Sequence, residues 1–272
     1  MGTATTSGAA ERSAEGREGG AVAPRRLERR LRTMTWGDVR AALDRGCDRV
    51  VVPFGAVEQH GSHLPLETDA LLGDRLGPLL AERLDALCAP TVPIGWSEHH
   101  MARAGTLSLR PQTLRLIVRD VVESLARHGF RTIVLLPTHA GNAAPLEHAA
   151  RVHHPPSGVR IAAVGDMEAL ARALYSISNR RGLPLAEAIA HAGEIETSLA
   201  LALAPAAVRM AWDQGDDGPE EREPSLKRPE APPLPGSGEA RKAMEAAGRA
   251  YVSAFLTECL RQLEQQGVTP CA

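Results

Sequence analysis

Residues 55–69, Gly-Ala-Val-Glu-Gln-His-Gly-Ser-His-Leu-Pro-Leu-Glu-Thr-Asp, concentrate ionisable side chains directly after an apolar run. Glu58, His60 and His63 stand close together, and Asp69 follows at the predicted start of a helix. If the apolar strand continues through Glu58 and His60, the alternation of a strand places both side chains on one face. Carboxylate and imidazole groups are ligands for zinc, manganese or iron(II). The segment therefore predicts a metal site, with a polar surface loop as the alternative.

A second polar segment follows the apolar run 132–136, where a turn of small residues contains His139 and Asn142. In an open parallel sheet, ligands lie outside the carboxyl ends of the strands. We therefore expect His139 to emerge at the same edge of the sheet as Glu58 and His60. A purely structural histidine is the alternative at this position.

A third segment, residues 191–199, places His191, Glu194 and Glu196 before a run of apolar helical residues. Acidic side chains in the first turn of a helix stabilise its positive end, and this effect accounts for Glu194. Glu196 is different, because it lies beside Thr197 and is followed by apolar residues. Its position predicts a side chain that faces the protein interior.

These segments need a scaffold that brings them together, and the apolar pattern predicts one. Short β-branched runs alternate with longer helical patterns, which is typical of a layered α/β domain with a largely parallel sheet. The sequence contains neither a GxGxxG nor a GxxxxGK(S/T) loop, which disfavours a nucleotide-binding Rossmann domain. The predicted strands are 49–54, 132–136 and 159–164, and the predicted helices are 68–84, 111–129 and 239–266.

Composition limits the class of protein. The chain has 272 residues, of which 43% are hydrophobic, so it can bury an enzyme-sized core. Its formal net charge of -2 gives no field that would attract nucleic acid or an anionic membrane. No apolar run approaches the roughly 20 residues that span a bilayer, and we find no secretory leader. We therefore expect a cytoplasmic protein with a small-molecule substrate and with no nucleic-acid or membrane partner.

The organisation along the chain follows from local composition. Residues 1–30 are small, polar and charged, so we expect a disordered N-terminal extension. We expect the folded domain over 31–272, with an exposed proline-rich loop at 214–238. The four cysteines form no CxxC pair, which suits a reducing compartment, and we interpret them as packing residues.

The three polar segments, in this order, resemble the motifs of the creatininase family. Members of that family carry a GxxEQHGxHLPxxTD segment, an NGHxxN-like turn and an HAGxxETS segment. The resemblance covers the chain from about Trp36 to the C-terminal helix. It implies a three-layer α/β/α sandwich with a largely parallel sheet, a two-metal hydrolytic site and a homo-oligomer, frequently a hexamer.

The resemblance also implies which residues hold two divalent ions, whether zinc, manganese or iron(II). Glu58, Asp69 and His139 would hold one ion, and His60 and Asp69 the other. Asp69 would therefore bridge the two ions. A water activated between them is the implied nucleophile.

Other site residues follow from the same resemblance. Creatininase supplies a glutamate two positions after its turn histidine, where this chain has Gly141, and Glu196 is the implied replacement. His191 matches the proton-transfer histidine of the family, and we predict His191 and Glu196 as catalytic residues. His63 and Asn142 are predicted to orient the substrate or to support the metal ligands.

Departures from the family pattern concern the substrate. The usual Asn-Gly before the turn histidine is Pro137-Thr138 here, and a Phe-Pro pair after His100 is replaced by Arg103-Ala104. We predict that His100 and Arg103 contact the substrate. Arg103 would grip a carboxylate or phosphate, with a solvent-exposed arginine as the alternative. These departures indicate a substrate other than creatinine.

The sequence thus predicts a metal-dependent amidohydrolase that cleaves the C–N bond of a cyclic amide, a formamide or a small peptide-like amide. One alternative is a peptidase of the mycofactocin type, which clips a peptide tail. The alternative from another class is a catalytically silent binding or scaffold protein with the same fold.

Overall fold

The central sheet consists of four parallel strands in the order β2-β1-β3-β4. The computed structural model describes residues 28–209 and 238–269. β1 and β3 pair in register from Arg49 opposite Thr132 to Phe54 opposite Pro137. The strands are β1 Arg49–Phe54, β2 Leu87–Cys88, β3 Thr132–Pro137 and β4 Arg160–Ala163.

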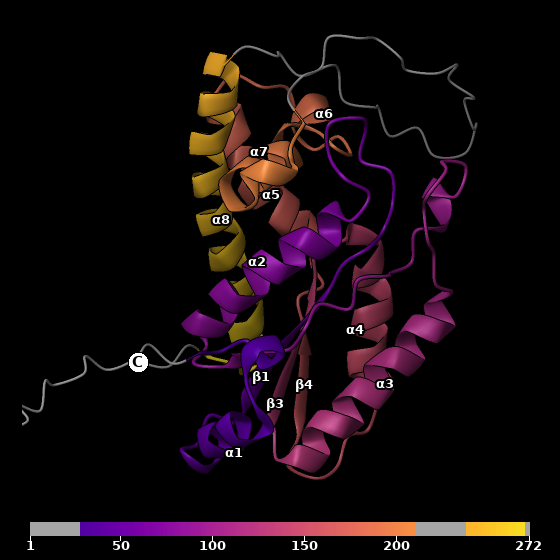
Figure 1. Ribbon diagram of the computed structural model, residues 1–272, viewed down its shortest axis with the longest axis vertical. Coiled ribbons are helices and arrows are strands. Elements are labelled where there is room, and N and C mark those ends of the chain that lie inside the picture. The colour runs from indigo at the N-terminus through magenta and orange to yellow at the C-terminus, as the bar shows by residue number, and fades with distance from the viewer. Residues whose placement is uncertain (1–27, 210–237, 270–272) are drawn as a thin grey trace, which may run out of the picture.

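Helices cover both faces of the sheet because β1 and β3 direct apolar side chains to both faces in turn. The helices are α1 Trp36–Asp44, α2 Thr68–Arg83, α3 Pro111–His128, α4 Ala143–Val152, α5 Met167–Arg180, α6 Leu185–Ala188, α7 Glu194–Leu203 and α8 Gly238–Gln265. Val51 and Val134 pack in a core with α2, α5, α7 and α8. Val50 and Ile133 pack in a second core with α1, α3 and α4. Figure 1 shows α3 and α4 on one side of the strands and α8 on the other. The predicted three-layer α/β/α sandwich is confirmed.

The predicted elements agree closely with the structure. α2 begins at Thr68, and α3 begins with Pro111 and ends before Gly129, whose φ is 111°. Proline suits the first turn of a helix, and glycine adopts the left-handed conformation that ends one. The strand predicted at 159–164 is shorter, over Arg160–Ala163.

Most of the predicted N-terminal extension and of the proline-rich loop at 214–238 lies outside the described residues. Of the extension, Arg29 is already held by the sheet, because its carbonyl accepts the Cys88 N–H at 2.7 Å. Cys47, Cys88 and Cys259 are buried free thiols. This agrees with their interpretation as packing residues.

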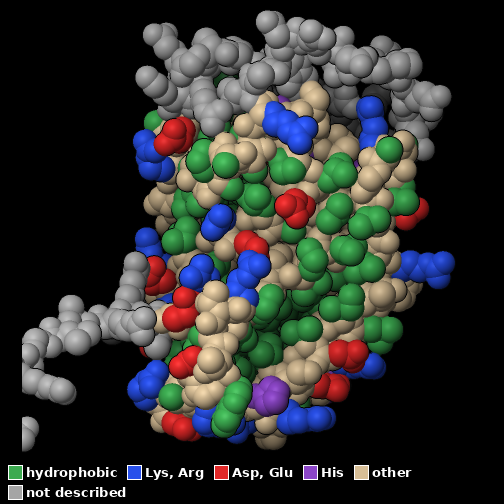
Figure 2. All heavy atoms as spheres, viewed as in Figure 1, with side chains coloured by type: hydrophobic (Ala, Val, Ile, Leu, Met, Phe, Trp, Pro, Cys, Tyr) green, Lys and Arg blue, Asp and Glu red, His purple; other side chains and the backbone are tan. Residues whose placement is uncertain are grey.

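The described surface agrees with the small net charge. Figure 2 shows Lys and Arg intermingled with Asp and Glu on the face in view. Among the described residues, no helix combines the length and the apolar character needed to cross a membrane.

Candidate metal centre

The ionisable side chains of the three segments meet beyond the carboxyl ends of β1 and β3, where ligands bind in parallel sheets. The first strand ends at Phe54, as predicted, and does not continue through Glu58 and His60. The chain turns there, and the Glu58 N–H donates to the Leu66 carbonyl at 2.8 Å. The side chains of Glu58 and His60 still converge, because their ligand atoms and those of Asp69 lie within 4.8 Å of one another.

His139 lies between two buried carboxylates. Its Nδ1 is 3.3 Å from Glu58 Oε1 and 3.1 Å from Asp69 Oδ2. Its Nε2 is 3.0 Å from the Trp96 carbonyl oxygen, which can only accept, so Nε2 carries a proton. Nδ1 is therefore the nitrogen that can hold a cation or a second proton. Metal-ligating histidines characteristically donate their other ring N–H to an oxygen in this way.

His60 repeats this arrangement on the other side of Asp69. Its Nδ1–H donates to the Glu58 carbonyl, which leaves Nε2 to face Asp69 Oδ1 at 3.4 Å. Asp69 thus directs one carboxylate oxygen towards His60 and the other towards His139. A carboxylate between two imidazoles can bridge two cations.

Several buried atoms of this cluster have no hydrogen bond within the described residues, namely Glu58 Oε2, His60 Nε2 and Asp69 Oδ2. A buried polar atom without a partner costs about 1–3 kcal/mol. Ligand atoms of these three residues lie within 4.8 Å of one another. Their chemistry and placement therefore fit a divalent cation.

The carboxylates and histidines shift the pKa values of one another. Burial alone would raise the pKa of Asp69, but His60 and His139 outweigh it and hold that pKa below its usual range. Burial likewise would raise the pKa of Glu58, but His139 lowers it. Burial would lower the pKa of both histidines, but Asp69 outweighs it and raises the pKa of His60 to about 9 and of His139 to about 10. The carboxylates are therefore ionised, and a divalent cation would bind by displacing the second protons of the two imidazoles.

His191 and Glu196 approach the cluster from the start of α7. The ring centroids of His191 and His60 are 4.5 Å apart. Ala192 has a left-handed φ of 56°, and its N–H donates to the Glu196 carboxylate. Ligand atoms of His60, His191 and Glu196 lie within 4.8 Å of one another. Glu196 is close enough to share a cation with His60, and its role as the replacement ligand stays a prediction.

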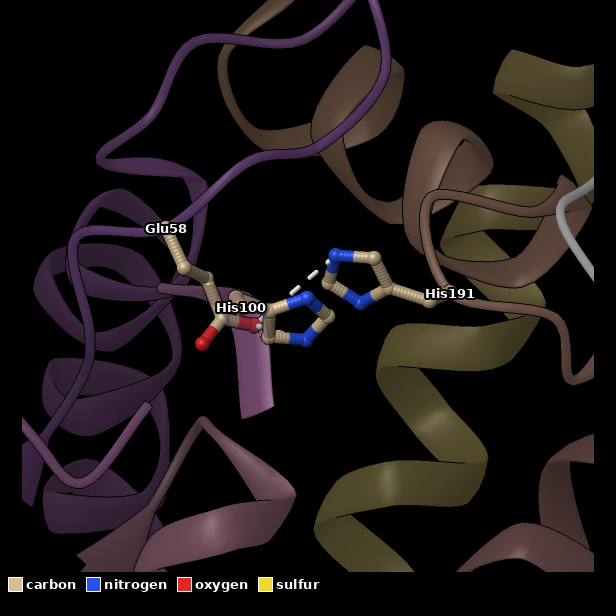
Figure 3. Close-up of side chains that lie close together, drawn as sticks. All are labelled: Glu58, His100 and His191. Atoms are coloured by element: carbon tan, nitrogen blue, oxygen red, sulfur yellow. Dashed lines mark ion pairs between the residues drawn. The ribbon is translucent and has the colours of Figure 1, made fainter. Parts of the chain in front are cut away.

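Two adjacent histidines complete the cluster. His100 directs Nε2 towards Glu58 Oε1 at 3.4 Å, and Figure 3 shows its ring beside that of His191. Burial lowers the pKa of His100 to about 4, so this ring is neutral. Sequence reasoning missed His99, whose ring lies 5.9 Å from that of His139 with an interplanar angle of 11°. The signal that could have found it is the His-His pair itself.

His63 and Asn142, predicted to orient the substrate or to support the metal ligands, connect segments of the site. His63 Nε2 lies 2.8 Å from Thr197 Oγ1 and joins the first motif to α7. The Asn142 amide oxygen accepts the Trp96 N–H at 2.9 Å, and its nitrogen donates to the Gly55 carbonyl at 2.9 Å. Asn142 is fully buried. These contacts tie segments of the site together, and the roles of both side chains stay predictions.

Arg103 lies on an exposed turn next to the cluster. Its N–H donates to the His100 carbonyl at 3.0 Å. The loop then returns through Leu107, whose N–H donates to the Val57 carbonyl at 2.9 Å. Arg103 therefore stands on a loop tied at both ends to site segments, and its contact with substrate stays a prediction.

The turn after β3, where Pro137-Thr138 replaces the usual Asn-Gly of the family, is hydrogen-bonded to another segment of the site. The Thr138 hydroxyl donates to the Asp69 carbonyl at 2.8 Å and so ties this turn to α2. Gly141 has no room for a side chain, because a Cβ there would lie 2.7 Å from the Trp96 carbonyl oxygen and closer still to His139 Nε2. A ligand from position 141 would require His139 to move.

Comparisons with known proteins agree with this arrangement. The creatininase family model, described as creatinine amidohydrolase, matches residues 32–263. Mycofactocin precursor peptide peptidase of Mycobacterium tuberculosis is 29% identical over 231 residues, which cover 79% of this chain and 84% of that protein. Creatinine amidohydrolase of Pseudomonas putida is 35% identical over 114 residues, which cover 40% of this chain and 44% of that protein. A crystal structure of creatinine amidohydrolase superposes with a TM-score of 0.67 at 25% identity, covering 88% of this chain and 98% of that one.

The fold and the buried cluster of carboxylates and histidines are those of a divalent-metal hydrolase. The family match spans most of the chain. The chain belongs to the creatininase family, and the resemblance seen in its three motifs is confirmed.

Proposed function

We propose that this protein is a metal-dependent amidohydrolase that cleaves a carbon–nitrogen amide bond with an activated water. The observation that carries the proposal is the placement of Asp69, whose oxygens lie 3.4 Å from His60 and 3.1 Å from His139. A buried carboxylate held between two imidazoles suits a bridge between two divalent ions.

Two ions would share this site. Glu58, Asp69 and His139 would hold one ion, and His60, Asp69 and Glu196 the other. Mixed carboxylate and imidazole ligands admit zinc, manganese or iron(II). Bound ions would supply an acidified water and polarise the substrate carbonyl.

His191 would transfer the proton that the departing nitrogen needs. His191 holds one ring proton at Nε2, which donates to the Gln59 carbonyl at 2.5 Å. Nδ1 is therefore the nitrogen that takes up a proton and passes it to the departing nitrogen. A positioned imidazole typically contributes a factor of about 100 to 10,000 to the rate of such a step.

The test measures metal content and hydrolysis together. The purified chain is reconstituted with zinc, manganese or iron(II), and newly formed amine groups are followed on a panel of lactams, formamides and short peptides. His60→Ala and Asp69→Ala should lose bound metal and turnover, whereas His148→Ala, an exposed histidine on α4, should keep both. Full metal content and activity in the first two variants would refute the site. A wild-type chain that binds no divalent metal would favour the silent scaffold.

A peptide substrate is the second candidate. The match to mycofactocin precursor peptide peptidase covers 84% of that protein, whereas the match to creatinine amidohydrolase covers 44% of its length. Arg103 on the exposed loop would suit the carboxylate of a peptide. Product analysis by mass spectrometry separates a clipped peptide from an opened lactam or a released formate.

The proposal includes a cytoplasmic homo-oligomer, with a hexamer as the form implied by the family. Mass photometry at several protein concentrations tests the assembly. A monomer at every concentration would contradict it.

A further inference from the structure

Gln59 contacts two histidines of the site, and its side chain has no role in the proposed function. It lies between Glu58 and His60 and is partly buried. Its side-chain Nε2 is 3.3 Å from His100 Nδ1, and its main-chain carbonyl oxygen is 2.5 Å from His191 Nε2. One residue therefore contacts two of the three histidine rings that face the Glu58 carboxylate, those of His100 and His191 (Figure 3).

The orientation of the Gln59 amide is fixed by the next turn. Its Oε1 accepts the Gly61 N–H at 3.2 Å, and Gly61 supports this turn with a left-handed φ of 64°. With its oxygen occupied there, the amide presents its NH2 group to His100. An NH2 group only donates, so His100 Nδ1 must accept and cannot carry a proton.

The proton of a neutral His100 ring then lies on Nε2, which is 3.4 Å from Glu58 Oε1. The main-chain carbonyl of Gln59 acts on the second ring, because a carbonyl only accepts and requires a proton on His191 Nε2. The two rings stack with centroids 4.3 Å apart and an interplanar angle of 27°. Both rings therefore carry their proton on Nε2, directed at the Glu58 carboxylate by His100 and at the Gln59 carbonyl by His191.

We propose that Gln59 is a positioning residue whose side-chain amide fixes the Nε2–H tautomer of His100. His100 is thereby a hydrogen-bond donor and not a metal ligand, although its ring nitrogen lies near enough to Glu58 and His191 to share a cation. The catalytic meaning of this assignment rests on the proposed function, in which an N–H from His100 would meet the substrate. The tautomer itself does not depend on that function.

Nitrogen NMR of the zinc-loaded full-length protein, labelled with 15N in its histidine rings, reads the tautomer directly. The His100 signals are assigned by their loss in His100→Gln. The wild type should show a bare Nδ1 and a protonated Nε2. Gln59→Glu replaces the NH2 donor with an acceptor of the same shape and should protonate Nδ1. Gln112→Glu, an exposed position on α3, adds the same charge elsewhere and should leave the wild-type pattern unchanged.

Two further results decide the inference. Gln59→Ala should give a mixture of both tautomers, and His100→Gln should keep the zinc content of the wild type. A protonated Nδ1 in the wild type, an unchanged pattern in Gln59→Glu, or a loss of zinc in His100→Gln would overturn it. The spectra need no substrate, so the expected pattern in a protein without amidase activity would refute the proposed function and leave this inference standing.

Discussion

The hydroxyl of Thr138 donates a hydrogen bond to the main-chain carbonyl of Asp69 at 2.8 Å. Thr138 directly precedes His139 in the turn after β3, and Asp69 lies in the first turn of α2. One hydrogen bond therefore sets the spacing between two predicted metal ligands that are far apart in the sequence. The altered Pro137-Thr138 turn therefore takes part in positioning these two residues.

Replacing this hydroxyl should weaken metal binding. Thr138→Val keeps the shape of the side chain but leaves the Asp69 carbonyl without this donor. We expect metal affinity to fall by about 10- to 100-fold, as for other partners that orient metal ligands. Titration against a competing chelator measures the change. Thr138→Ser retains the hydroxyl and should bind metal like the wild type, and equal affinity in Thr138→Val would refute the role of this bond.

The second prediction concerns Gly141, which lies in the same turn, and its effect on metal affinity. A methyl group at this position would press on the Trp96 carbonyl and on the ring of His139. Gly141→Ala should therefore break the hydrogen bond from His139 Nε2 and lower metal affinity by about 10- to 100-fold. Gly37→Ala on α1 is the control, because the nearest atom to its Cβ would be 3.7 Å away. If both variants bind metal equally well, the turn has room that this geometry does not show.

Much of the fold and of the site follows from the sequence. The runs at 49–54 and 132–136 are β-branched and apolar because these strands are buried on both faces, and this pattern is readable without a structure. The position of Glu58 and His139 after such strands is enough to place them at one edge of the sheet. β2 was not predictable, because the two residues of Leu87–Cys88 are too few to show any periodicity.

The contacts that depend on distant parts of the chain could not be predicted. The sequence predicts that Glu194 stabilises the positive end of a helix, but in the structure Glu194 is buried and accepts hydrogen bonds from side chains. Arg181 pairs with its Oε1, and the Tyr251 hydroxyl donates to its Oε2 at 2.6 Å. Tyr251 lies in α8, far from Glu194 in the sequence, and no local sequence pattern predicts the contact between them.

This network should hold α7, and with it His191 and Glu196, against α8. Tyr251→Phe removes the hydrogen bond to the buried Glu194 carboxylate and the 2.8 Å hydrogen bond with the Ser178 hydroxyl, and we expect a loss of about 1.5–3 kcal/mol or more in the free energy of unfolding. Urea denaturation measures it. Tyr175→Phe is the matched control, because the Tyr175 hydroxyl makes a longer bond of 3.4 Å at the surface. Equal losses in the two variants would contradict the role of the network.

The pH dependence of this effect has a definite sign. Burial raises the pKa of Tyr251, and the Glu194 carboxylate adds to the shift. A group with a raised pKa in the folded state contributes its full stability below its unfolded pKa, which is about 10 for tyrosine. The difference between wild type and Tyr251→Phe should therefore stay constant from about pH 7 to 9 and shrink as the pH rises through the raised pKa. A difference that grows above that range would contradict this assignment.

The remaining prediction concerns the exposed loop that carries Arg103. If its guanidinium binds a substrate carboxylate, Arg103→Ala should raise KM for acidic substrates about tenfold, since a hydrogen bond to a charged group contributes about 1.5 kcal/mol. The value of kcat should change little, because such a contact stabilises the bound substrate and the transition state equally. Arg103→Lys keeps the charge without the two-pronged geometry and should recover part of the loss. Arg110→Ala, an exposed arginine just before α3, is the control. Unchanged KM values for acidic and neutral amides in Arg103→Ala would remove the carboxylate grip and leave Arg103 as a solvent-exposed loop residue.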